Sequence, residues 1–200
     1  MKDSREHILT IALQLFLQKS FKEVTMKEIV EQTGLSKGAF YHYFSSKEQV
    51  FEEVIRYFFA DFLVKDFEQF SHGSLALFYQ DSLKAMETKI KSAKIILQGK
   101  EKTFSTNHYF LLFDAMKMLP GFKQELFELQ RQELRSWTRI IAIARKNGEI
   151  RTEMTDEQVA KLFIYLGDGL GITLIIHEEM NKTRKELQTL WDGLYAALKK

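Results

Sequence analysis

The sequence predicts an all-α protein in which a short N-terminal helix-turn-helix unit is followed by a larger helical body. Apolar residues recur at the three- and four-residue spacing of amphipathic helices along most of the chain. The chain has one proline and no convincing alternating strand pattern, so few breaks are enforced. A pair of short helices joined by a glycine turn fits between Met26 and Phe44.

Composition narrows the class of protein. Hydrophobic residues make up 45% and charged residues 28% of the 200 residues, as in an ordinary soluble globular protein. The absence of cysteine suits a reducing cytosol, so we expect a cytoplasmic location. The apolar run Leu162–Ile176 is interrupted by Asp168 and is too short for a bilayer span, so no membrane partner is expected. A net charge of +2 does not by itself indicate nucleic-acid binding.

The first three helices are marked by spacing and by capping residues. Apolar residues at i, i+3, i+4, i+7 and i+8 predict the first helix, namely Ile8, Ile11, Ala12, Leu15 and Phe16. Thr25 as N-cap with Glu28 three residues later predicts a capping box at the start of the second. Gly34 supplies a left-handed turn, and Ser36 can cap the third helix.

The rest of the chain is predicted to be helical as well. Ser45 or Ser46 begins a long fourth helix through Val50, Val54, Phe58 and Phe62. Later helices are expected near residues 75–98, 105–118, 122–147, 156–180 and 184–199. Breaks between them are expected at Gly99, at Pro120–Gly121, at Lys146–Thr155 and near Asn181. We therefore expect a helix-turn-helix domain at 1–48 and a helical domain at 49–200.

The third helix combines two kinds of residue at helical spacing. Projection at about 100° per residue places Phe40 and Phe44 on the inner side and Tyr43 at its margin. The outer side then carries a cation, a glycine, a phenol and an imidazole, from Lys37, Gly38, Tyr41 and His42. Such groups suit phosphates and groove edges of DNA. A glycine turn between helices also occurs in many proteins that do not bind DNA.

The stretches "ILTIALQLF", "FKEVTMKEIV" and "TGLSKGAFYHYFSSKE" strongly resemble the N-terminal domain of the TetR family of transcriptional regulators, from Arg5 to about Val54. The resemblance implies a three-helix DNA-binding unit, a long connecting helix, and a helical ligand-binding and dimerising domain. It also implies phosphate contacts from Thr25, Ser36, Gly38, Tyr41, Tyr43 and Lys47. Lys37 and His42 are then the expected readers of the DNA groove, and double-stranded operator DNA is the expected partner.

Two positions depart from the family pattern. Ser20 stands where the family usually has glycine, and Val30 stands where a small alanine usually packs between the two helices. The bulk of Val30 is expected to tilt the recognition helix slightly. Neither departure removes an expected DNA contact.

Two C-terminal helices carry long apolar stripes that predict a homodimer interface. The stripe residues assigned to it are Leu162, Leu166, Leu170, Leu187, Leu190, Trp191, Leu194 and Leu198. Two helices from each chain would form a four-helix interface, which the resemblance also implies. The alternative is that these residues fill the core of a single chain. "GDGLG" (Gly167–Gly171) follows no strand and lacks phosphate-loop spacing, so it is not a nucleotide site.

The middle of the chain is rich in aromatic residues and methionine, which suits an apolar effector cavity. The residues assigned to it are Phe59, Phe62, Tyr79, Met86, His108, Tyr109 and Phe113. Ordinary core packing is the alternative for each of them.

Together these features predict a regulator, most simply a repressor, that binds a palindromic operator as a homodimer and is released by a small, largely apolar effector. An effector-independent DNA-binding dimer is the alternative, and its body would lack a cavity. An enzyme is a different class. The five histidines show no HExxH-type spacing and no serine sits in a nucleophile elbow, so no enzymatic activity, cofactor or metal is expected.

Overall fold

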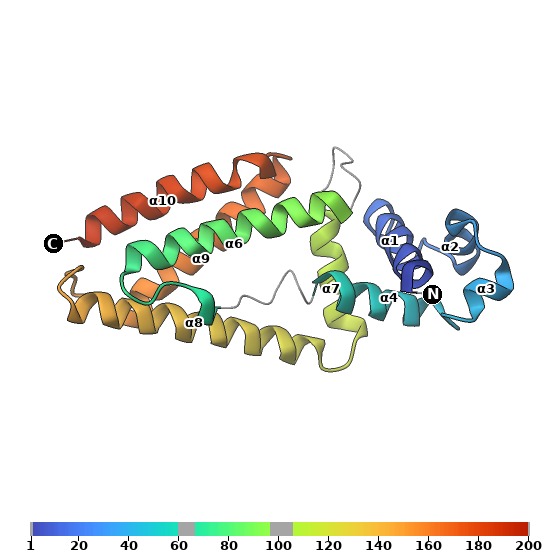
Figure 1. Cartoon of the computed structure of the whole chain (residues 1–200), viewed down its shortest axis with the longest axis horizontal. Coiled ribbons are helices and arrows are strands. Elements are labelled where there is room, and N and C mark those ends of the chain that lie inside the picture. The colour runs from blue at the N-terminus through green and yellow to red at the C-terminus, as the bar shows by residue number, and fades with distance from the viewer. Residues whose placement is uncertain (1, 60–66, 97–105, 200) are drawn as a thin grey trace. The chain divides into compact units, whose positions relative to one another are not determined.

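The computed structural model describes residues 2–59, 67–96 and 106–199, and these are almost entirely helical (Figure 1). The elements are α1 (Lys2–Gln18), α2 (Met26–Thr33), α3 (Lys37–Tyr41), α4 (Lys47–Val54), the π-helical η1 (Ile55–Phe59), the 3-10 η2 (Phe67–Gln69), α6 (Leu75–Ile96), α7 (Asn107–Met118), α8 (Phe122–Lys146), α9 (Asp156–Ile176), the 3-10 η3 (Met180–Lys182) and α10 (Thr183–Leu198). A lone antiparallel bridge joins Ile150 to Lys199. The predicted all-α fold is confirmed.

The predicted caps are formed at the start of three helices. The hydroxyls of Thr25, Ser36 and Ser46 accept the backbone N–H groups of the third residue of α2, α3 and α4 respectively. Gly34 ends α2 at φ 67° as its left-handed C-cap. Each cap satisfies an N–H or C=O group that a helix end leaves without an intrahelical partner. These short helices are therefore bounded by their own sequence.

The ends of α8 and α9 explain one predicted boundary that is correct and one that is wrong. α8 ends in a Schellman-type turn with Gly148 at φ 72° and a 2.9 Å bond from Glu149 N–H to the carbonyl of Ala144. α9 ends in the same way, but with Glu178 at φ 58° in the glycine position. Because no glycine marks this turn, the sequence extended the helix to residue 180, whereas it ends at Ile176.

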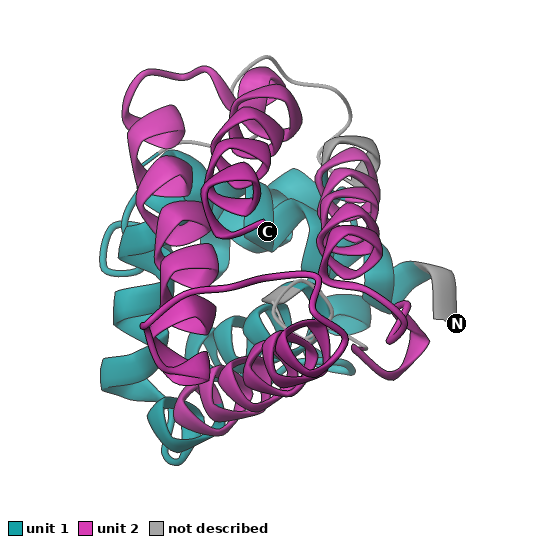
Figure 2. Cartoon of the chain, turned by 90° about the vertical axis from the view of Figure 1, so that its left-hand side faces the viewer, with its two compact units in different colours: residues 1–64, 93–125 teal, residues 65–92, 126–200 magenta. Residues whose placement is uncertain are grey.

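The described residues divide into two compact units by their internal packing. Unit 1 comprises residues 1–64 and 93–125, and unit 2 comprises residues 65–92 and 126–200 (Figure 2). Unit 1 therefore groups α7 with the helix-turn-helix. This is a division by packing, so the predicted functional division after residue 48 stays a prediction.

Unit 1 is built on a cluster of phenylalanine rings. Phe51 of α4 contacts Phe16 of α1 and Phe21 of the following turn, with ring centroids 5.4 and 4.8 Å apart. Phe40 and Phe44 are 0% and 1% exposed, as predicted for the inner side of the third helix. α7 also packs on α1, and the amide of Asn107 donates a hydrogen bond to the carbonyl of Leu17.

Unit 2 has its own aromatic core, in which helices far apart in sequence meet. The indole ring of Trp137 stacks on Phe163 at 5.0 Å and meets Trp191 edge-on at 5.2 Å. The indole N–H of Trp191 donates to the carbonyl of Phe163 at 3.0 Å. The carboxylate of Glu149, which follows α8, accepts the first two N–H groups of α6 and the hydroxyl of Tyr195. Tyr195 thereby ties α10 to the same network.

The helix α9 is longer than the apolar run Leu162–Ile176 that it contains. Its 21 residues are long and apolar enough to cross a membrane by length and composition, so the expectation that this segment was too short was wrong. Core helices of soluble proteins meet the same criterion. One side of α9 supplies Val159, Ala160 and Phe163 to the core of unit 2. Only 28% of the apolar window is buried within the chain, so another apolar side lies open.

Candidate DNA-binding interface

The short helix α3 separates buried from exposed side chains as predicted. Phe40 and Phe44 point into unit 1, whereas Lys37, Gly38 and His42 are exposed and Tyr41 keeps 43% of its surface accessible. Within the part of the chain that the structure describes, Lys37 forms no ion pair. Its charge is therefore available to an anionic partner. The structure thus brings four predicted residues to one surface of the helix.

The predicted phosphate contacts Thr25 and Ser36 are both exposed N-cap residues. Thr25 stands at the start of α2 and Ser36 at the start of α3. The hydroxyl of each is already an acceptor from its own helix, at 3.2 Å in both cases. Its O–H hydrogen can still be donated to an acceptor such as a phosphate oxygen.

The start of α2 also carries a carboxylate. The ammonium group of Lys19 donates to Glu28, and this hydrogen bond is the main reason that the pKa of Glu28 lies below its usual value. Glu28 is therefore ionised and paired near neutral pH. The pairing reduces the repulsion that an isolated carboxylate would exert on a nearby phosphate.

Tyr43 and Lys47 do not belong to the exposed face of α3, because both side chains are half-buried. Tyr43 is half-buried, and its ring meets that of His42 edge-on at 5.4 Å. The Nζ atom of Lys47 donates to the backbone carbonyls of Phe21 and Val24 at 2.7 and 2.8 Å. The sequence did not predict this internal role, because a contact 23 or 26 residues away leaves no local pattern.

The predicted dimer residues divide into three groups within the single chain. Leu187, Trp191 and Leu198 are at most 5% exposed and belong to the core of unit 2. Leu162 and Leu190 keep 39% and 40% of their surface accessible. The remaining predicted residues pack partly against the core, namely Leu166, Leu170 and Leu194.

Several exposed apolar residues on the same helices were not predicted. On α9, Tyr165, Ile172 and Ile176 are 62%, 46% and 62% exposed. Together with Leu162 they follow a spacing of three, seven and four residues, which keeps them on one side of the helix. These residues form a second apolar stripe in the sequence of α9. The sequence alone does not show which of the two stripes is buried in the core of the chain.

The predicted effector residues lie on different elements. Tyr79 is buried in unit 2, and Met86 packs against the same core. His108 and Tyr109 are half-buried on α7, whereas Phe113 is 55% exposed. The side chain of Phe59 and the whole of Phe62 lie outside the described residues.

Two further observations concern ligand chemistry. Burial, together with the hydrogen bond that its hydroxyl donates to Asp192 at 2.8 Å, raises the pKa of Tyr79 to about 12. Tyr79 is therefore a neutral core residue at ordinary pH, and its hydroxyl already has a hydrogen-bond partner.

Among the described residues, no cluster of three or more histidine, aspartate or glutamate side chains is placed to hold a metal ion.

Similar sequences agree with this geometry. Residues 8–54 match the sequence model of bacterial regulatory proteins of the TetR family. The chain is 26% identical over 165 residues to the HTH-type transcriptional repressor KstR2 of Rhodococcus jostii (strain RHA1), covering 80% of this chain and 74% of KstR2. It is 46% identical over 55 residues to the uncharacterized HTH-type transcriptional regulator YfiR of Bacillus subtilis (strain 168), covering 27% of each protein. The match to YfiR thus spans about a quarter of that relative's length.

Solved structures share the fold along nearly the whole chain. SmeT, the repressor of the Stenotrophomonas maltophilia multidrug efflux pump SmeDEF, superposes with a TM-score of 0.62 at 18% identity, covering 98% of this chain and 90% of SmeT. The fold and the exposed helix α3 define a helix-turn-helix DNA-binding protein. Residues 8–54 carry the N-terminal helix-turn-helix domain found in bacterial regulatory proteins of the TetR family. The relatives and the solved structure named above are transcriptional regulators or repressors.

Proposed function

We propose that this chain is a cytoplasmic transcriptional repressor that binds a palindromic operator as a homodimer and is released by a small, largely apolar effector. The DNA-binding part of this proposal rests mainly on Gly38 in α3, a glycine with open space beside its Cα atom. A Cβ atom added to Gly38 would meet nothing within 4 Å, and its φ is not positive. The fold therefore does not require glycine, which costs about 0.5–1 kcal/mol relative to alanine within a helix. A DNA backbone approaching closely from outside accounts for it.

The neighbouring residues then divide into two roles. Lys37 and His42 reach base edges in the major groove, because they stand on the exposed side of α3 with free donors. Thr25, Ser36, Tyr41 and Tyr43 donate to phosphates and fix the register of the helix on the duplex. The unpaired charge of Lys37 supports its place in the groove.

A homodimer is supported by the open apolar side of α9 and α10. Its large members are Leu162, Tyr165, Ile172, Ile176 and Leu190. Gly169 and Gly193 lie on the same exposed helices, and a Cβ atom at either would meet nothing within 4 Å. Glycine within a helix is again unnecessary for the chain itself, and it permits close approach of another helix. A second copy burying this side forms the four-helix interface.

Dimerisation is also what the DNA-binding function needs. One helix-turn-helix unit covers only a few base pairs and makes a handful of phosphate contacts. Two units related by a two-fold axis read a palindrome with half-sites about 34–36 Å apart. A dimer held on a promoter blocks polymerase without further contacts. The matched relative KstR2 and the structural neighbour SmeT are both described as repressors.

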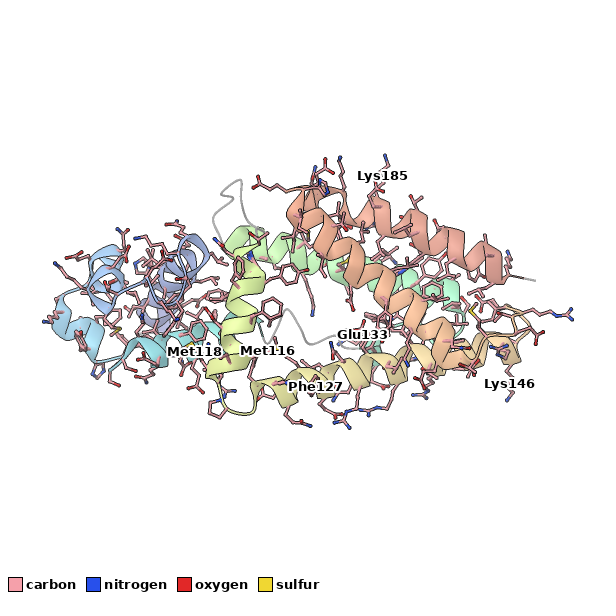
Figure 3. All side chains as sticks on the ribbon, turned by 180° about the vertical axis from the view of Figure 1, so that it is seen from behind. Met116, Met118, Phe127, Glu133, Lys146 and Lys185 are labelled. Carbon is pink, nitrogen blue, oxygen red and sulfur yellow. The ribbon has the colours of Figure 1, made fainter. Side chains whose placement is uncertain are left out.

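Release by an effector is supported by the helix α7. Its Phe110 and Phe113 are 61% and 55% exposed, and Met116 lies on the same helix (Figure 3). Apolar side chains of this kind suit a largely apolar ligand. Because α7 packs on α1 within unit 1, a ligand that shifts α7 also acts on the helix-turn-helix. A difference of a few kcal/mol in affinity for the two conformations suffices for release.

The proposal is tested by selecting bound sequences from random duplex DNA at low salt, with the full chain. We expect enrichment of a palindrome and a complex containing two copies of the chain. Small apolar compounds are then screened for release of the enriched duplex. Absence of any enriched palindrome contradicts the operator part. A palindrome that no compound releases favours the effector-independent dimer.

A further inference from the structure

We infer that Lys47 is a positioning residue that holds the N-cap Thr25 in place for DNA, and is not itself a phosphate ligand. The inference rests on the proposed DNA-binding function. It replaces the phosphate contact that the family resemblance implies for Lys47.

The ammonium group of Lys47 is engaged within unit 1. Two of its three N–H groups have acceptors, since the carbonyl oxygens of Phe21 and Val24 lie 2.7 and 2.8 Å from Nζ. The same nitrogen lies 4.3 Å from the centroid of the Phe21 ring, at cation–π distance. Both hydrogen bonds are partly buried, so solvent screens them less than it screens a surface pair.

The acceptors belong to the turn that joins α1 to α2. This turn is closed by bonds from the N–H groups of Glu23 and Val24 to the carbonyl of Ser20, at 3.0 and 3.3 Å. The carbonyls of Phe21 and Val24 lie before the first residue of α2, so the helix supplies them with no donor. Lys47 supplies that donor from the first position of α4.

α4 contacts the segment between α1 and α2 through a second residue, which lies four residues after Lys47. Phe51 meets the ring of Phe21 edge-on at 4.8 Å and is itself 0% exposed. Lys47 and Phe51 are four residues apart and therefore lie on the same side of α4. The turn is thus fixed to α4 by charge-assisted hydrogen bonds from Lys47 and by an apolar contact from Phe51.

The contact reaches Thr25 through a single peptide group. The carbonyl of Val24 and the N–H of Thr25 belong to one planar trans peptide, in which they point in opposite directions. A donor that fixes the carbonyl of Val24 therefore also fixes the orientation of the Thr25 N–H and of the cap residue. On the other side, the hydroxyl of Thr25 accepts the backbone N–H of Glu28 at 3.2 Å. Lys47 and Glu28 hold Thr25 between them.

The test measures operator affinity against salt concentration for the full chain, two Lys47 variants and one control variant. Lys47→Met keeps an apolar stem without donors, and Lys47→Gln keeps donors without charge. We expect Lys47→Met to weaken binding roughly tenfold with an unchanged slope of log K against log salt. We expect Lys47→Gln to recover part of the affinity. Lys37→Met is the matched control: it removes a charge that the proposed function places on base edges, so it should relax base preference, which Lys47→Met should leave unchanged.

A double-mutant cycle with Thr25→Val separates positioning from general loss of stability. If Lys47 acts through Thr25, Thr25→Val costs much less affinity in the Lys47→Met background than in the wild type. Lys37→Met should keep its full cost in that background. If Lys47→Met does not fold, Lys47→Gln takes its place in the cycle.

Two results overturn the inference alone. One is a slope lowered by about 0.9 per subunit in the Lys47 variants, which marks a direct phosphate contact. The other is full additivity with Thr25→Val. If the wild-type chain binds no duplex at all, the proposed function fails, and this inference fails with it.

Discussion

Phe40 and Tyr41 are consecutive residues of α3 with ring centroids 5.8 Å apart, yet Phe40 is 0% exposed and Tyr41 is 43% exposed. The edge-on contact between the two rings links the core of unit 1 directly to the surface that we assign to DNA. The position of that surface is therefore set by buried packing rather than by the exposed residues themselves.

Substitution of Gly38 is the most direct test of the DNA-binding surface that we assign to α3. Gly38→Ala should raise the free energy of unfolding by about 0.5–1 kcal/mol, because alanine favours the helix and its Cβ meets nothing in the chain. The same methyl group should weaken operator binding at least tenfold, by blocking close approach of the DNA. Chemical denaturation and fluorescence anisotropy measure the two effects.

The matched control is Gly73→Ala, because a Cβ at Gly73 also meets nothing within 4 Å and Gly73 belongs to unit 2. It should leave operator affinity unchanged. Wild-type affinity in Gly38→Ala would contradict the assignment of α3 to DNA.

Lys37 should determine base preference. Lys37→Ala is expected to cost about 1–3 kcal/mol on the preferred operator and to relax specificity at one or two base positions. Selection from random duplexes measures both quantities. Lys146 is an exposed lysine at the end of α8 (Figure 3), so Lys146→Ala is the control and should change neither. A uniform loss on every sequence would place Lys37 on a phosphate instead.

The open side of α9 should determine the oligomeric state. Ile172→Glu places a charge in the middle of the proposed interface and should produce monomers, with operator affinity reduced at least a hundredfold through loss of the second half-site. Light scattering after size-exclusion chromatography gives the mass. Leu77→Glu changes a leucine of α6 that is 55% exposed, and it should remain dimeric. Dimers of unchanged stability in Ile172→Glu would assign the interface elsewhere.

Tyr79 should make the protein sensitive to alkali. Its pKa is raised to about 12 in the folded chain, mainly by burial, from an ordinary value near 10. Between these values the folded chain keeps a proton that the unfolded chain has lost, so stability falls as pH rises from about 10 to about 12. Thermal unfolding of Tyr79→Phe should show a shallower fall over this range. Tyr57→Phe changes a tyrosine that is 40% exposed and is the control. Equal slopes for wild type and Tyr79→Phe would contradict the assignment.

Local signals account for what could be predicted. The caps Thr25 and Ser36 and the turn residue Gly34 act within four residues, so their roles can be read from the sequence. The separation of Phe40 from Tyr41 follows from helical periodicity alone. Family resemblance added the assignment to DNA, which periodicity does not contain.

Contacts between distant residues account for what could not be predicted. Lys47 reaches back 26 residues to Phe21, and Glu149 caps α6 across 74 residues. The stripe that contains Trp191 was assigned to a partner chain, yet Trp191 lies in the core of its own chain. An apolar stripe shows that a helix side is covered, but not by which chain.

The packing of α7 on α1 bears on how this protein can be engineered. A graft that moved only residues 1–48 onto the body of another regulator would remove the helix that covers one side of α1, along with the hydrogen bond from Asn107 to Leu17. The transplanted helix-turn-helix unit would then lack the packing that α7 provides to α1. A chimaera that carries residues 106–118 together with residues 1–48 keeps the contact between α7 and α1. It is therefore the appropriate design for biosensors built from this chain.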